Sequence, residues 1–193
     1  AIAVDAGGNA YVVGSTASAA FPTTPGAYDV VANGGNDAFV TKLSPDGSTL
    51  VYSTFVGGTG DDLGYAIAVD TSGNAVVIGV TNGGFPTLNA AQPSYGGGVY
   101  DAFLFKLDST GTALAYSTYV GGTGYELTTS SGGLYSVGIA VDALGAAYIT
   151  GWTTSTNFPT TLGAYLTTPP AGIKSFVAKF DTNGARVYST YLA

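Results

Sequence analysis

The acidic residues that could hold a metal ion follow glycine-rich connections. Gly57-Gly58-Thr59-Gly60 leads into Asp61 and Asp62, and a second connection of the same type leads into Glu126. Calcium accepts carboxylate, carbonyl and water oxygens, so Asp61, Asp62 and Glu126 are candidate Ca²⁺ ligands. The first connection lacks the D-x-D-x-D-G spacing of a dedicated calcium loop. The competing and favoured interpretation is a structural link between units that requires glycine. No cofactor is predicted, and Ca²⁺ is kept as the alternative.

Catalytic chemistry has few side chains available, because the chain contains no His and no Cys. General acid–base catalysis is left to carboxylates, Tyr and Lys. Glycoside hydrolysis uses two carboxyl groups roughly 5–10 Å apart. Asp61 and Asp62 are adjacent, so in an extended segment they point to opposite sides. No catalytic residue is predicted, and we expect the protein not to be an enzyme.

The candidate ligand-binding residues are aromatic and acidic side chains placed in or beside the long connections. Trp152 and Tyr95 have flat apolar faces on which a sugar ring can stack, and Asp37 and Asp101 are expected on the same side of the molecule. The alternative for Trp152, packing between sheets, stays open. Packing is the favoured interpretation for the recurring phenylalanine of each Phe-Pro-Thr segment, at Phe21, Phe85 and Phe158.

Composition narrows the partners and the cellular setting. The net charge of -7 opposes the electrostatic attraction that supplies most nucleic-acid affinity, so no nucleic-acid partner is expected. No apolar stretch approaches the ~18 residues that span a bilayer, so no membrane insertion is expected. Charged residues make up 9% of the chain, against roughly 25% in an ordinary soluble domain. The surface must therefore be rich in Thr, Ser, Gly, Asn and Tyr, which is typical of a secreted bacterial protein.

Three copies of one pattern organise these residues. Each copy opens with Ile-Ala-Val-Asp, at Ile2, Ile67 and Ile139. Each closes with Tyr-Ser-Thr and an aromatic residue, at Tyr52, Tyr116 and Tyr188. The openings are 65 and 72 residues apart, which fits a four-stranded unit with one long loop.

Each copy contains four short runs rich in Val, Ile, Tyr, Phe and Thr, which predict strands. In the first copy they cover about 1–5, 10–15, 37–43 and 50–56. Glycine-containing turns separate the runs, and no segment keeps apolar residues at helical spacing. Several runs are apolar on both faces, which predicts a sheet covered on both sides. The third copy departs from the pattern at 174–176, where we align Ser with the Asp of the other two copies.

These features predict an all-β chain of three four-stranded antiparallel units, each like a β-propeller blade. The units cover about 1–57, 66–121 and 138–193 in a single array. The first strand of each unit has small residues and is expected at the crowded axis, with the Tyr-Ser-Thr strand at the rim. The long loops are expected to share one face of the array.

Four motifs carry a family resemblance: I-A-V-D-x-x-G-N-A-Y-V-x-G, F-P-T-T-x-G-A-Y, D-A-F-V-x-K-L and Y-S-T-Y-V-G-G-T-G. Together they resemble the bacterial β-propeller repeats known as SBBP repeats, over essentially the whole chain. The resemblance implies a propeller fold and a secreted, extracellular or cell-surface location. It brings no catalytic residue set.

Closed propellers have roughly four to eight blades, so three blades are expected to form part of a larger or oligomeric propeller or array. The expected partners are other copies or further blades of the same protein. The expected function is that of a non-enzymatic extracellular structural or interaction module, in a closed ring or a filament. The alternative is a carbohydrate-binding module, or a carbohydrate-active enzyme, that binds glycans on the long-loop face.

Overall fold

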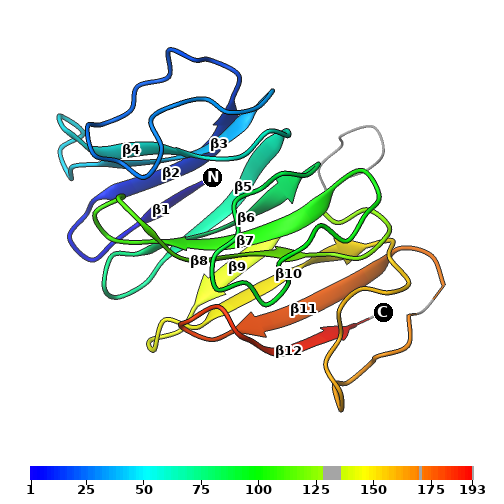
Figure 1. The fold of residues 1–193 in the computed structure, drawn as a ribbon. Coiled ribbons are helices and arrows are strands. Elements are labelled where there is room, and N and C mark those ends of the chain that lie inside the picture. Colours follow the sequence, from blue (N-terminus) through cyan, green and yellow to red (C-terminus); the bar gives the residue numbers. More distant parts are fainter. Residues whose placement is uncertain (128–135, 170, 193) are drawn as a thin grey trace.

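Three antiparallel sheets make up the protein (Figure 1). The computed structural model describes residues 1–127, 136–169 and 171–192. The first sheet contains β1 (Ile2–Val4), β2 (Ala10–Thr16), β3 (Asp37–Leu43) and β4 (Leu50–Val56). The second contains β5 (Asp62–Val69), β6 (Ala75–Thr81), β7 (Asp101–Leu107) and β8 (Leu114–Val120). The third contains β9 (Gly138–Val141), β10 (Ala147–Thr153), β11 (Lys174–Phe180) and β12 (Arg186–Tyr191).

The prediction of an all-β chain with three four-stranded blades is confirmed, and the strands of the first copy lie close to their predicted positions. Each blade is a simple meander, in which every strand pairs with its neighbour in the sequence. The described residues contain no helix of the length and apolarity needed to cross a membrane.

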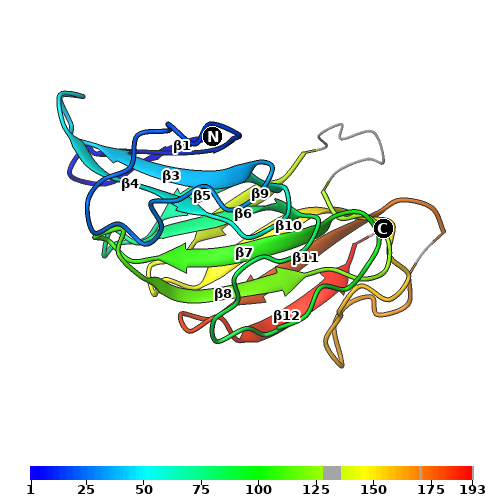
Figure 2. The same cartoon turned by 45° about the horizontal axis from the view of Figure 1, so that its top comes forward.

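The three blades stack face to face, with β5–β8 between the other two (Figure 2). Strand β5 contacts both β1 and β9, so the first strands of the blades gather along one edge of the stack. This arrangement agrees with the prediction that the Ile-Ala-Val strands lie nearest the axis. Small side chains such as Ala3 and Ala68 allow these strands to approach one another.

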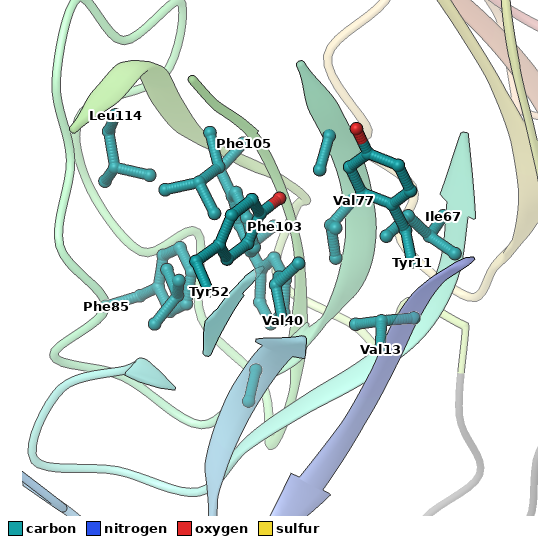
Figure 3. Packing of buried hydrophobic residues seen from close by; sticks show 14 of the residues in the cluster. Tyr11, Val13, Val40, Tyr52, Ile67, Val77, Phe85, Phe103, Phe105 and Leu114 are labelled. Atoms are coloured by element: carbon teal, nitrogen blue, oxygen red, sulfur yellow. The ribbon is translucent and has the colours of Figure 1, made fainter. Parts of the chain in front are cut away.

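Each blade has two faces, because successive side chains of a strand point to opposite sides. We call the face toward the preceding blade in the sequence the near face, and the face toward the following blade the far face. At the first junction, Tyr11, Val13 and Val40 on the far face of the first blade pack against Ile67, Val77 and Phe105 on the near face of the second (Figure 3). A second core of the same kind joins the second blade to the third.

The Phe-Pro-Thr segments fold back onto these cores. Phe85 stacks on Phe103 with ring centroids 4.1 Å apart, and Phe158 packs on Phe176 at 4.4 Å. Both rings are buried, so the packing interpretation of the recurring phenylalanines is confirmed for these two positions. Phe21 packs on the first blade's own β3, and it keeps partial exposure.

The second blade begins earlier than 66, whereas β9, the first strand of the third blade, begins at Gly138. Strand β5 starts at Asp62 and passes a β-bulge between Gly64 and Ala66. In the third blade, Glu126 forms an isolated bridge with Thr153, and the Leu127 N–H donates to the Trp152 carbonyl. The acidic residue after each glycine-rich link therefore belongs to the edge of the next blade.

One sequence alignment was wrong. Asp37 pairs with Thr16 and Asp101 with Thr81, and the residue that pairs with Thr153 in the same way is Lys174. Lys174 therefore occupies the aspartate position of the third blade, while Ser175 occupies the position of an alanine. The pairing of β10 with β11 determines this register, whereas the sequence motif alone was compatible with a shift of one residue.

Candidate functional site: the blade junctions

A pair of carboxyl groups is buried at each of the two junctions. Asp37, at the start of β3, meets Asp62, at the start of β5, between the first and second blades. Asp101, at the start of β7, meets Glu126 between the second and third blades. All four side chains are at most 1% exposed. Carboxyl groups are rarely buried in this way unless they are paired or protonated.

Backbone N–H groups hold one oxygen of each acid at the first junction. Asp62 Oδ2 accepts from the Gly58 N–H at 2.7 Å, and Asp37 Oδ2 accepts from the Asn33 N–H at 2.6 Å. The two Oδ1 atoms have no hydrogen-bond partner among the described residues. Gly57 lies against both side chains, since a Cβ added there would be 2.4 Å from Asp37 Oδ1 and 3.0 Å from Asp62 Oδ2.

The second junction repeats this geometry with different donors. Glu126 Oε1 accepts from the Thr153 and Ser155 hydroxyls, each at 2.6 Å. Asp101 Oδ2 accepts from the Gly96 N–H. The other two oxygens of the pair, Asp101 Oδ1 and Glu126 Oε2, lack a partner in the described part of the chain. A Cβ added at Gly121 would lie 2.8 Å from the first and 2.7 Å from the second. Both oxygens therefore converge on the space that glycine leaves free.

Burial raises the pKa values of these acids. The pKa of Asp62 rises to about 6, with the nearby Asp37 and Asp61 carboxylates adding to the effect. The pKa of Asp101 rises to about 8, because of burial and the negative charge of Glu126. Burial also raises the pKa of Glu126. Near neutral pH the second pair therefore keeps a proton, and a protonated carboxyl can donate to its partner.

The arrangement supports a bond across the junction better than catalysis. Glycoside hydrolysis requires that a sugar and a water reach both carboxyls, and these carboxyls are closed off by two packed sheets. A proton shared by the two carboxyls would form a hydrogen bond between one blade and the next.

The candidate calcium ligands do not come together. Asp61 accepts from the side-chain amides of Asn36 and Asn82, whereas Asp62 turns into the junction. Glu126 belongs to the other junction. Within residues 1–127, 136–169 and 171–192 there is no group of three His, Cys, Asp or Glu side chains that could hold a metal ion.

The four candidate ligand-binding residues do not form one site, although Tyr95 lies close to Asp101: burial and the Asp101 charge raise the pKa of Tyr95. Asp37 and Asp101 are buried at separate junctions. The Tyr95 ring packs edge-on against Tyr119, with centroids 5.9 Å apart. Trp152 is a strand residue of β10, only 7% exposed, beside an open hollow of about 510 Å³ on the far face of the third blade.

The tyrosine–glycine contact between blades is a feature that the sequence interpretation missed. The Tyr52 ring covers Gly111 in the β7–β8 turn, where an added Cβ would be 2.4 Å from the ring. Tyr116 covers Gly184 in the β11–β12 turn in the same way, at 2.5 Å. The sequence does contain a sign of this contact, because every copy has both a Tyr-Ser-Thr strand and a glycine at the end of the turn before that strand.

A buried ion pair is the second missed feature. Lys106 Nζ lies 2.7 Å from Asp70 Oδ2, and both side chains are less than a tenth exposed. Gly145 of the third blade lies against this pair, with its Cβ position 3.3 Å from Lys106 Nζ. Asp70, which closes the first turn of the second blade, therefore has a role at the junction besides holding the turn.

Comparison with known families finds one repeat twice in the chain. A family model described as a beta-propeller repeat, SBBP, matches residues 51–86 and 115–159. Each match starts in the last strand of one blade, crosses the glycine-rich link and the acidic residue, and ends at the Phe-Pro of the next blade. No curated protein matches the chain. The chain thus carries two matches to the SBBP beta-propeller repeat, each spanning the link from one blade to the next.

Proposed function

We propose that this repeat array is a non-enzymatic structural or interaction module outside the cell, whose end blades are covered by other copies or further blades of the same kind. The observation that carries the proposal is the unequal exposure of equivalent positions. Residues that are buried at the two internal junctions are open at the two ends of the stack.

The near face of the first blade shows this difference. Ile2 is 66% exposed, whereas its equivalent in the second blade, Ile67, is 7% exposed. The far face of the third blade shows it again, because Leu192 is 45% exposed and its equivalents Val56 and Val120 are fully buried. A repeat array hides such residues only against a neighbouring repeat.

The extracellular setting is supported by composition. Charged residues make up only 9% of the chain, against roughly 25% in an ordinary soluble domain. The non-enzymatic role is supported by the closed carboxyl pairs, which are the clearest acidic constellations in the described structure.

Carbohydrate binding is the second candidate, and one observation favours it. The open hollow beside Trp152 is also lined by the polar residues Thr150 and Ser175. Its weakness is the small exposed area of the indole, since stacking on sugar requires an accessible ring face.

Two measurements on the 193-residue chain separate these functions. Sedimentation over a micromolar concentration range, without ligand, is expected to show self-association. A glycan array is expected to show no retention. A monomer that binds glycans, and loses them on Trp152→Ala, would replace the proposal with the carbohydrate-binding alternative.

A further inference from the structure

The two internal junctions show how one blade recognises the next. In each, a tyrosine on the far face of one blade covers a turn glycine of the following blade: Tyr52 over Gly111, and Tyr116 over Gly184. The third tyrosine of the series, Tyr188, stands at the equivalent place on the third blade. None of the described glycines lies against its ring.

The matching open glycine is at the other end of the same chain. Gly47 occupies the turn between β3 and β4, and its N–H donates to the Ser44 carbonyl at 2.9 Å, as the Gly111 N–H does to Asp108 at 3.0 Å. Gly47 has a φ of +70°, close to the +73° of Gly111. A Cβ added at Gly47 would meet nothing within 4 Å. Gly47 therefore matches the glycines that tyrosines cover at the internal junctions, but no described tyrosine covers it.

A second contact of the first junction repeats at the ends. The Tyr11 hydroxyl lies 3.0 Å from Asp5 Oδ2 and 3.2 Å from the Gly73 carbonyl oxygen of the next blade. On the third blade, the Tyr148 hydroxyl lies 3.0 Å from Asp142 Oδ2. The third blade thus presents on its far face the same tyrosine–aspartate pair that the first blade uses at the first junction.

A lysine completes the likeness between the two far faces. Lys42 lies over the Tyr11 ring at 4.8 Å, and Lys179 lies over the Tyr148 ring at 4.7 Å. The corresponding receiver on the first blade is Gly8, whose N–H donates to the Asp5 carbonyl just as the Gly73 N–H donates to Asp70. Polar contacts and apolar surface at the two ends therefore match in kind and position.

We propose that a second copy of this chain docks head to tail, with the near face of its first blade on the far face of the third blade, Tyr188 covering Gly47 and the Tyr148 hydroxyl reaching the Gly8 carbonyl. The inference rests on the proposed function and specifies its partner and register. The hollows on the far face, about 510 and 330 Å³, offer room for exposed near-face side chains such as Ile2.

Because the two ends differ, the contact is heterologous. The rotation that relates one copy to the next decides whether a closed ring or an open filament forms. Two copies with three blades each give six, which lies within the roughly four to eight blades of closed propellers. We therefore expect a dimer closed by two identical junctions. A species that grows with concentration would mean that the same contact repeats along a filament.

The test compares Gly47→Ala with Gly26→Ala. Both glycines have a positive φ, +70° and +79°, and neither Cβ position has an atom within 4 Å. Backbone strain and thermal melting of the dissociated chain should therefore change alike. Only Gly47→Ala places a methyl group where the tyrosine must dock, so it should weaken association about tenfold or more in sedimentation equilibrium, while Gly26→Ala should not.

A second pair of variants tests the other side of the contact. Tyr188→Ala should weaken association about tenfold or more, and Tyr165→Ala, at a loop tyrosine that is 82% exposed, should leave it unchanged. Association of normal strength in both Gly47→Ala and Tyr188→Ala would overturn this docking mode but leave the proposed function standing. A wild-type chain that stays monomeric and binds no glycan would overturn the second copy as the partner, and a monomer that binds glycans would overturn the proposed function as well.

Discussion

Asp101 Oδ1 and Glu126 Oε2 converge on Gly121 at the junction of the second and third blades, 2.8 and 2.7 Å from the position of an added Cβ. Two ionised carboxylates cannot occupy such a space at low cost, because burial weakens their hydration and leaves their repulsion unscreened. One proton between them changes the repulsion into a hydrogen bond. The junction therefore links the packing of two blades to the pH.

This link predicts that the protein is more stable at pH 5 than at pH 8. The pKa of Asp101 is about 8 in the folded chain and about 3.8 in its unperturbed state, so between these values the folded chain binds the extra proton. The free energy of unfolding must then fall as the pH rises through this range, by up to about 1.4 kcal/mol per pH unit. Asp62, with a pKa of about 6, adds to the fall below pH 6. Urea unfolding at several pH values measures it.

Asp101→Asn should flatten this pH dependence, because the amide donates to Glu126 without a titrating proton. Asp46→Asn is the matched control. Hydrogen bonds from Ser44 and Ser48 hold the pKa of that exposed carboxyl down at about 2, so its contribution is lost only in strong acid. An Asp101→Asn protein with the wild-type slope between pH 5 and 8 would contradict the shared proton.

Replacement of Glu126 separates the role of the proton from that of the hydroxyl donors. Glu126→Gln keeps an oxygen for the Thr153 and Ser155 hydroxyls and supplies an N–H for Asp101, so at pH 8 it should stabilise the fold by about 1 kcal/mol. Glu126→Ala removes the acceptor and should destabilise the fold by about 1–3 kcal/mol. Thermal melts of both variants at pH 8 decide this, and equal losses in the two would contradict it.

The fold could be predicted because each structural rule repeats three times in the chain. The runs rich in Val, Ile, Tyr, Phe and Thr, the turn glycines and the Tyr-Ser-Thr ending all mark the same boundaries in each copy, so an error in one copy is corrected by the others. The blade limits were less accurate, since the bulge at Gly64 lets β5 extend back to Asp62. The glycine-rich link before β5 has no periodic pattern of apolar residues, so its sequence could not show that the strand extends this far.

The junction pairs could not be predicted from sequence, because their members lie 25 residues apart in both cases and belong to different blades. Asp37 and Asp101 were candidates because they were expected on the side of the long loops, but that placement does not tell whether a side chain faces a ligand or a neighbouring sheet. The Lys174 alignment failed for a related reason. Only the ladder with Thr153 shows which residue replaces the aspartate.

The tyrosine–glycine contact predicts unequal costs for one substitution at two glycines. Gly111→Ala should destabilise the fold by about 1–3 kcal/mol more than Gly26→Ala. Both glycines have a positive φ, so the strain of a side chain is similar, but only at Gly111 would the Cβ lie 2.4 Å from the Tyr52 ring. Urea unfolding compares the two variants. If the contact is the cause, Gly111→Ala should cost less in a chain that already carries Tyr52→Ala than in the wild-type chain. An equal cost in the two chains would contradict it.

The last prediction concerns two lysines at equivalent positions. Lys106→Met should destabilise the fold by about 3–5 kcal/mol, because Asp70 would lose its counter-charge beneath the third blade and keep only the hydrogen bonds from Ser72 and Asn74. Lys179→Met, in a chain kept dilute enough to be dissociated, should lower the free energy of unfolding much less than Lys106→Met does. The ion pair of Lys179 with Asp142 is longer, at 3.7 Å, and both side chains are more than a quarter exposed. The third blade covers the Lys106–Asp70 pair, whereas no described blade covers the Lys179–Asp142 pair. Equal losses of stability in the two variants would show that coverage by a neighbouring blade does not set the strength of the lysine–aspartate pair.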